Sequence, residues 1–132
     1  MKVIVNVEKV AGERNCSCFI DGTIDNCGLF GFGPTVDAAV KDLLVARQEL
    51  TELEGKNIPE LEMSFRYDIW AFFDKFPMNA SLVAKRIGIN PSLMRQYIAG
   101  SKKPSKKRVE QIQEGVRMLG QELSTISLQR FD

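Results

Sequence analysis

The chain has 132 residues, of which 18 are Lys or Arg and 17 are Asp or Glu, so its net charge is +1. This balance excludes a uniformly basic protein and an acidic solvating tail. With 44% hydrophobic and 27% charged residues, the composition is that of a globular protein with one domain or two small ones. No apolar run approaches the roughly 20 residues of a membrane span, and no secretory signal follows Met1. We therefore expect a cytoplasmic protein that does not bind membranes.

The residue types restrict the chemistry. The sequence has no histidine and three cysteines, Cys16, Cys18 and Cys27. Without His there is no Ser-His or Cys-His catalytic pair, and the cysteines lack both CxxC spacing and a fourth member for a closed zinc site. Cys16 and Cys18 lie two apart in a strand-like run, which favours reduced core side chains. A thiol or metal site shared across a dimer is the alternative, and no cofactor is expected.

The first part of the chain has the pattern of a small sheet with one covering helix. Val3, Val5 and Val7 alternate with Ile4, Asn6 and Glu8, as in a half-buried strand. A helix begins after Thr35, a suitable N-cap, and ends at Glu54–Asn57. Further strands are predicted at residues 15–20, 29–32 and 61–67.

A short aromatic helix follows the last predicted strand. Asp68 can cap it, and Pro77 stops it. Its apolar side chains have helical spacing and are expected to be core, packed onto the sheet or between the later helices: Ile69, Phe72, Phe73 and Phe76.

Three more helices are predicted in the second part of the chain. Asn79 caps the first, which runs to about Ile87. Pro91 opens the second, which ends before Gly100, and Ser105 caps a longer third helix. The apolar stripe of that third helix comprises Val109, Ile112, Val116, Leu119 and Leu123. The sequence therefore predicts an α+β fold, with a β-β-β-α-β domain over residues 1–68 and an all-α helix-turn-helix domain over residues 69–132.

The turn between the first two of these helices is typical of a helix-turn-helix. Gly88 permits a left-handed conformation, and Ala84, four residues earlier, allows the helices to cross closely. The apolar positions expected to hold the helix pair together are Val83, Ile87, Ile89, Met94 and Tyr97. A helical hairpin that binds no nucleic acid is the alternative interpretation of this pattern.

The distribution of charge favours DNA binding. Residues 75–109 hold nine basic side chains and no acidic one, whereas residues 1–74 have a net charge of −6 and residues 110–132 of −2. A basic block on such a motif is the electrostatic footprint of phosphate binding. Ser92, Arg95 and Gln96 on the second helix are of types that read base edges. The candidate DNA-binding residues are Lys85, Asn90, Ser92, Leu93, Arg95, Gln96, Lys102, Lys103, Ser105, Lys106 and Lys107.

Both parts of the chain resemble known families. The segments Ala84–Ile89 and Gln96–Ser105, with Tyr97, Gly100, Pro104 and Ser105, are similar to the Cro/repressor-type helix-turn-helix. The preceding segment, with Gly33-x-Thr35, Ala38-Ala39 and the join at Tyr67-Asp68, is similar to the N-terminal domain of HicB antitoxins. The second strand, Asn15–Phe19, departs from the pattern of that family, so no toxin-contacting residues are assigned.

The HicB resemblance implies a function in two parts. The N-terminal domain would bind and occlude a small basic ribonuclease toxin of the HicA type. The C-terminal domain would bind its own double-stranded operator and repress the operon, as a homodimer or a higher even oligomer. The alternative is a stand-alone repressor whose N-terminal domain dimerises or senses a ligand.

An enzyme is the second alternative. The HicB N-terminal fold resembles a truncated ribonuclease H, which needs clustered carboxylates to hold two metal ions. Only Asp21, Asp25 and Asp37 lie nearby, and their positions in turns and at a helix start favour local hydrogen bonding. We therefore do not expect catalysis.

Overall fold

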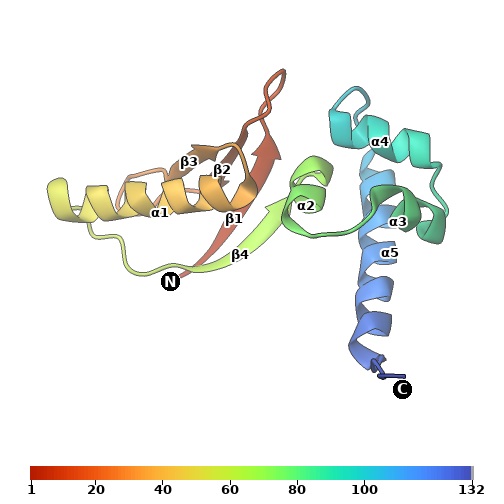
Figure 1. Ribbon diagram of the computed structural model, residues 1–132. Helices are drawn as coiled ribbons and strands as arrows, with labels where there is room; N and C mark the ends of the chain where they lie inside the picture. Colours follow the sequence, from red (N-terminus) through yellow and green to blue (C-terminus); the bar gives the residue numbers. More distant parts are fainter. Residues whose placement is uncertain (132) are drawn as a thin grey trace. The chain divides into compact units, whose positions relative to one another are not determined.

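The computed structural model describes residues 1–131 and divides into two compact units, residues 1–77 and the residues from Met78 onward. We call them the sheet unit and the helical unit. The described residues form a four-stranded mixed sheet and five helices (Figure 1). The expected α+β class is confirmed.

The sheet consists of β1 (Lys2–Lys9), β2 (Cys16–Ile20), β3 (Phe30–Gly33) and β4 (Glu62–Tyr67), in the order β3-β2-β1-β4. β2 is antiparallel to β1 and β3, whereas β4 is parallel to β1. The alternation seen in the sequence sets the faces, because successive strand residues point to opposite sides. Val5 and Val7 are fully buried on the inner face.

Helix α1 (Val36–Leu53) covers the inner face of the sheet (Figure 1). Thr35 caps it as predicted, since its hydroxyl accepts the Ala38 N–H at 3.1 Å. Gly31 of β3 allows the helix to approach closely, because a Cβ at this position would lie 2.1 Å from the Ala39 carbonyl oxygen. Leu43 of α1 is fully buried in the resulting core.

Helix α2 (Ile69–Lys75) belongs to the sheet unit, because the division between the units lies after Pro77. The sequence alone had placed the boundary before this helix, at residues 68/69. Ala71 is fully buried in the sheet core. The Asp68 carboxylate accepts the Ala71 N–H at 2.8 Å, which is the predicted cap, and also accepts the Lys9 N–H at 2.8 Å. The aromatic stripe packs within this unit, with the Phe76 and Tyr67 ring centroids 5.8 Å apart.

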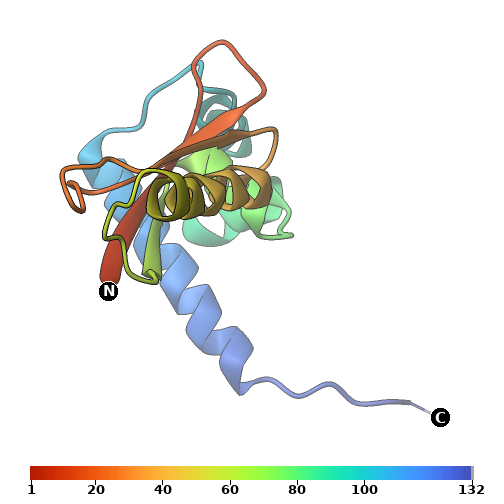
Figure 2. The same cartoon turned by 90° about the vertical axis from the view of Figure 1, so that its left-hand side faces the viewer.

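The helical unit contains α3 (Ala80–Ile87), α4 (Pro91–Ala99) and α5 (Lys106–Thr125). Asn79 and Ser105 cap α3 and α5 as predicted, each accepting a backbone N–H at 3.1 Å. Figure 2 shows the described residues after α5 as an extended segment. Within residues 1–131, no helix combines the length and the apolar character that crossing a bilayer requires.

Two of the three cysteines lie in the sheet core. Cys16 and Cys18 are fully buried, and the Cys18 thiol donates to the Ala39 carbonyl at 3.2 Å. Burial raises the pKa of Cys18 to about 11 and raises the pKa of Cys16 in the same direction. Cys27 is partly exposed, and all three thiols are free. The expectation of reduced core side chains holds for Cys16 and Cys18.

Candidate nucleic-acid interface

The turn between α3 and α4 follows directly from its sequence. Gly88 has a φ of +80°, in the left-handed region that residues with a Cβ disfavour. The Ala84 carbonyl, near the end of α3, accepts the Ile89 N–H at 2.8 Å. Ala84 itself is fully buried. Ala84 and Gly88, four positions apart, thus allow the chain to turn sharply between α3 and α4.

The apolar positions on both sides of this turn hold the helices together. Val83, Ile89 and Met94 are buried, as expected from the sequence. Ile112 of α5 is buried as well, and Ile87 and Tyr97 are partly buried. On α4 itself, Met94 and Tyr97 face this packed side, and the opposite side of the helix is exposed to solvent.

The exposed face of α4 carries the three predicted base-reading residues. Ser92, Arg95 and Gln96 are all exposed, and Arg95 and Gln96, three and four residues after Ser92, lie on the same side of the helix as Ser92. The Arg95 guanidinium donates to the Ser81 hydroxyl of α3 at 3.1 Å and to the Ser92 hydroxyl at 3.0 Å. The two serines therefore hold the arginine at the surface in a defined orientation. Sequence reasoning missed Ser81, since it lies on the other helix.

Two other candidates, Asn90 and Ser105, cap helices, and a third, Leu93, lies partly buried. The Asn90 side chain caps α4 by accepting the Ser92 N–H at 2.8 Å, and the Ser105 hydroxyl caps α5. Both caps lie at helix N-termini, where backbone N–H groups and the helix dipole favour an anion. Leu93 is partly buried beside the exposed face of α4.

Five of the predicted residues form a group of exposed lysines. Two lie in the loop after α4, two in the first turn of α5 and one on α3. None of the five is in an ion pair with any residue in the range 1–131. The loop is anchored to α4, because the Lys102 N–H donates to the Gln96 carbonyl at 3.3 Å. We call this group the lysine cluster: Lys85, Lys102, Lys103, Lys106 and Lys107.

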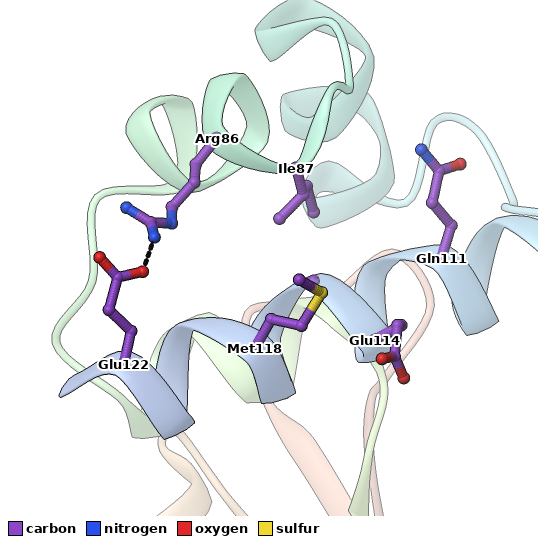
Figure 3. Close-up of a pocket in the computed structure, with 7 residues that line it drawn as sticks. Arg86, Ile87, Gln111, Glu114, Met118 and Glu122 are labelled. Atoms are coloured by element: carbon purple, nitrogen blue, oxygen red, sulfur yellow. Dashed lines mark hydrogen bonds and ion pairs between the residues drawn. The ribbon is translucent and has the colours of Figure 1, made fainter. Parts of the chain in front are cut away.

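Two residues of the basic block are engaged elsewhere. Lys75 lies in the sheet unit, where the hydrogen bond and charge of Asp37 raise its pKa. Arg86 forms an ion pair with Glu122 of α5 (Figure 3). The contrast of charge between the units nevertheless remains. The helical unit has ten basic and four acidic residues, a net charge of +6, and the sheet unit has a net charge of −5.

A groove separates α3 from α5 in the helical unit. Arg86 and Ile87 lie on one side of it, and Gln111, Glu114, Met118 and Glu122 on the other (Figure 3). Gly115 of α5 also lines it, and a Cβ added there would be 2.2 Å from Ile87 Cγ2. This glycine therefore sets how closely α3 and α5 pack.

The three aspartates of the enzyme alternative are held by separate partners. Asp21 accepts from Asn6 and Arg66, Asp25 accepts the Asn57 N–H, and Asp37 pairs with Lys75. In the part of the chain that the structure describes, no three His, Cys, Asp or Glu residues are grouped as a metal site.

Comparisons of this chain with protein-family models, with curated proteins and with solved structures found no match.

Proposed function

We propose that the helical unit is a helix-turn-helix that binds double-stranded DNA sequence-specifically, with α4 as the recognition helix, and that the protein is a transcriptional repressor. The observation that carries this proposal is the exposed face of α4, on which Arg95 is held between two serines and which has the exposed lysines of the lysine cluster on both sides of it in the chain. The alternative, a helical hairpin that binds no nucleic acid, does not explain why these basic side chains are exposed on and beside α4.

The two groups of residues would have different tasks. The lysine cluster would neutralise phosphates and so supply affinity that is independent of sequence and sensitive to salt. The α5 N-terminus, capped by Ser105, would add backbone N–H groups to the same contact. Arg95 and Gln96 would read base edges in the major groove, where arginine pairs well with guanine and glutamine with adenine.

A mobility-shift series with the upstream DNA tests this division. Arg95→Ala should cost about 1–3 kcal/mol at one base position, and Arg95→Lys should not restore it, since lysine lacks the bidentate fork. Lys103→Ala should weaken binding to all sequences alike and lower the slope of log affinity against log salt by about 1.

Lys41→Ala is the matched control, because Lys41 is an exposed lysine on α1 of the sheet unit. It should leave both affinity and salt slope unchanged. If the wild-type protein has no operator preference, or if Lys41→Ala and Lys103→Ala have equal effects, the proposal is wrong.

We further propose that the sheet unit binds a small basic protein, a ribonuclease toxin of the HicA type, so that the protein is an antitoxin. Its support is the resemblance described above, the net charge of −5 and an exposed pair of aromatic side chains. Phe30 and Phe32 of β3 are 57% and 61% exposed. Exposed aromatic side chains of this size commonly mark protein interfaces.

The register of the strands gathers these aromatic side chains on the outer face of the sheet. Gly31 and Gly33 face α1, so Phe30 and Phe32 point to the opposite side, where Phe19 lies directly across from Phe30. The edge of β3 is partly closed, because the Phe32 N–H donates to Asp42 at 2.9 Å. The partner would therefore contact the face of the sheet and not extend its edge.

Co-expression with the product of the neighbouring gene tests this second proposal. We expect a complex with a small basic protein, measured by its mass, that is lost in the Phe30→Ser, Phe32→Ser double variant. Leu53→Ser is the control, because Leu53 is 81% exposed at the end of α1. If no such protein is captured, or if the double variant binds it as well as wild type does, the stand-alone repressor becomes the better explanation.

A further inference from the structure

Ser81 lies outside the proposed recognition helix but contacts the arginine on it. It belongs to the first turn of α3 and is partly buried. Its hydroxyl oxygen accepts a hydrogen bond from Arg95 Nη1 at 3.1 Å, across 14 positions of the chain. The other acceptor of Arg95, Ser92, lies on α4 itself, three residues earlier. Ser81 is therefore the partner that fixes the arginine side chain relative to the other helix of the pair.

A contact of this kind changes what DNA binding costs an arginine. Arg95 is exposed, and a long exposed side chain loses much rotamer freedom when a ligand fixes it. If the side chain is already fixed in the free protein, this loss does not weaken the complex. Ser92 holds Arg95 only along its own helix, whereas Ser81 adds a second anchor point on α3. With anchor points on two helices, the guanidinium has a defined place before DNA arrives.

Arg86 shows what a charged partner does instead. It pairs with the Glu122 carboxylate (Figure 3), so a DNA phosphate or base would have to replace that carboxylate. The hydroxyl groups that hold Arg95 are neutral, so Arg95 keeps its positive charge. A guanidinium has five N–H donors, of which the two serines use two. The remaining donors suffice for the bidentate contact to guanine, so the serines fix Arg95 without preventing that contact.

Gln96, the neighbouring candidate for reading a base, is not held in this way. Its backbone carbonyl accepts the Ser101 hydroxyl and the Lys102 N–H, each at 3.3 Å. Its side-chain amide, however, forms no hydrogen bond with any residue that the structure describes. Both Arg95 and Gln96 are exposed on α4, but only the arginine side chain is fixed. The same helix thus offers one fixed and one unfixed side chain for comparison.

We propose that Ser81 is a positioning residue for sequence recognition, which holds Arg95 in place to read one base pair. Discrimination at that base pair then depends on Ser81, whereas discrimination at the base pair read by Gln96 does not. This inference rests on the proposed DNA-binding function and deepens it, because it places a determinant of specificity outside the recognition helix.

Mobility-shift titrations with single-base-pair variants of the operator test this role in the full-length protein. Arg95→Ala and Gln96→Ala first identify the base pair that each side chain reads. Ser81→Ala should then lower discrimination at the Arg95 position about threefold to tenfold, as for the loss of one exposed hydrogen bond, and leave the Gln96 position unchanged. Ser81→Thr keeps the hydroxyl and should discriminate like wild type. If Ser81→Ala lowers discrimination equally at both positions, Ser81 only stabilises the helix pair and the proposal is wrong.

A double variant shows whether the effect of Ser81 passes through the arginine. In the Arg95→Ala background, Ser81→Ala should cause no further loss of discrimination at any base pair, because the side chain that Ser81 positions is absent. A further loss there would overturn the proposal. Ser124→Ala is the matched control, since Ser124 is an exposed serine of α5 whose hydroxyl donates to the Gln121 carbonyl at 2.6 Å. It should leave discrimination unchanged at both positions.

A measurement without DNA separates this inference from the proposed function. NMR of the arginine nitrogens in the free protein should detect hindered rotation of the Arg95 guanidinium in wild type and freer rotation in Ser81→Ala. If wild type prefers the operator but Ser81→Ala discriminates as well as wild type does, the positioning role is wrong and the proposed function stands. If Ser81 hinders the rotation but wild type has no operator preference, the contact is real, whereas the proposed function fails and the positioning role fails with it.

Discussion

The two units differ in how they use their apolar residues. The sheet unit buries Val5, Val7 and Leu43 completely in a core between α1 and the sheet. The helical unit buries fewer side chains and leaves Val109, Met118 and Leu123 more than 40% exposed. Burial of apolar side chains is the main source of stability in a small unit, whereas apolar side chains at the surface can serve association. The difference teaches that the buried core is concentrated in the sheet unit, while both units keep exposed apolar side chains, among them Phe30 and Phe32 of β3.

The stabilities of the two units can be measured separately because the chain has a single tryptophan. Trp70 lies in α2 and packs against the sheet core, so its fluorescence reports on the sheet unit. Helical circular dichroism reports mainly on α3, α4 and α5 together with α1. We expect two unfolding transitions, one for each unit, and a substitution within one unit should shift only the transition of that unit.

The largest effect is expected from Leu43→Ala. Removing a fully buried leucine side chain should lower the stability of the sheet unit by about 2–5 kcal/mol, seen as a lower urea midpoint of Trp70 fluorescence. Leu44→Ala, one residue along α1 and 38% exposed, should cost much less. DNA binding should survive in both variants. If it is lost with Leu43→Ala, the units are not independent.

Gly115→Ala should act on the helical unit alone. The added methyl group would collide with Ile87, and we expect a loss of about 1–3 kcal/mol in the transition followed by circular dichroism. Gly120→Ala should instead gain about 0.5–1 kcal/mol, because an added Cβ there has no neighbour within 4 Å. Equal effects at the two glycines would show that α3 and α5 do not pack as described.

Substitutions of Ser105 separate helix capping from DNA binding. Ser105→Asp keeps a good N-cap, so stability should change by only a few tenths of a kcal/mol, but its charge should weaken binding to all DNA sequences roughly fivefold to tenfold. Ser105→Ala should do the reverse. It should lose about 1 kcal/mol of stability with the cap, but DNA affinity should change little because the substitution adds no charge. An aspartate variant that binds DNA like wild type would place the phosphates away from the start of α5.

The smallest effect concerns the thiols. Since burial raises the pKa of Cys18 to about 11 and that of Cys16 as well, both stay protonated at pH 8, and an alkylating reagent should modify Cys27 first. The raised pKa values also mean that the free energy of unfolding should fall as the pH rises from about 9 towards 11, because only the unfolded thiols ionise there. Mass spectrometry of the modified protein checks the order of reaction.

Local signals made much of the fold predictable. Side chains within three residues of a helix start determine the caps at Thr35, Asn79 and Ser105, so their identity was readable from sequence. Gly88 and Ala84 defined the turn for the same reason. The exposed residues of α4 were predictable because a turn with apolar positions on both sides determines which face of the helix is inside.

Contacts between distant residues were not predictable. Arg86 and Glu122 are 36 positions apart, and nothing local indicates that this arginine is paired. The assignment of α2 to the sheet unit depends on Ala71 in the core and on the bonds of Asp68. The sequence identified the apolar stripe of α5, but of Val109, Ile112 and Leu123 only Ile112 is buried. A periodic pattern identifies a face and does not say what covers it.

The cap at Asn79 has a consequence for how such proteins evolve. It lies directly after the division between the units, so the helical unit carries its own signal for starting its first helix. A segment with this property can be joined by recombination behind an unrelated domain without losing its first helical turn. The same division would therefore be a natural exchange point, at which another domain could replace the sheet unit in front of an unchanged helical unit.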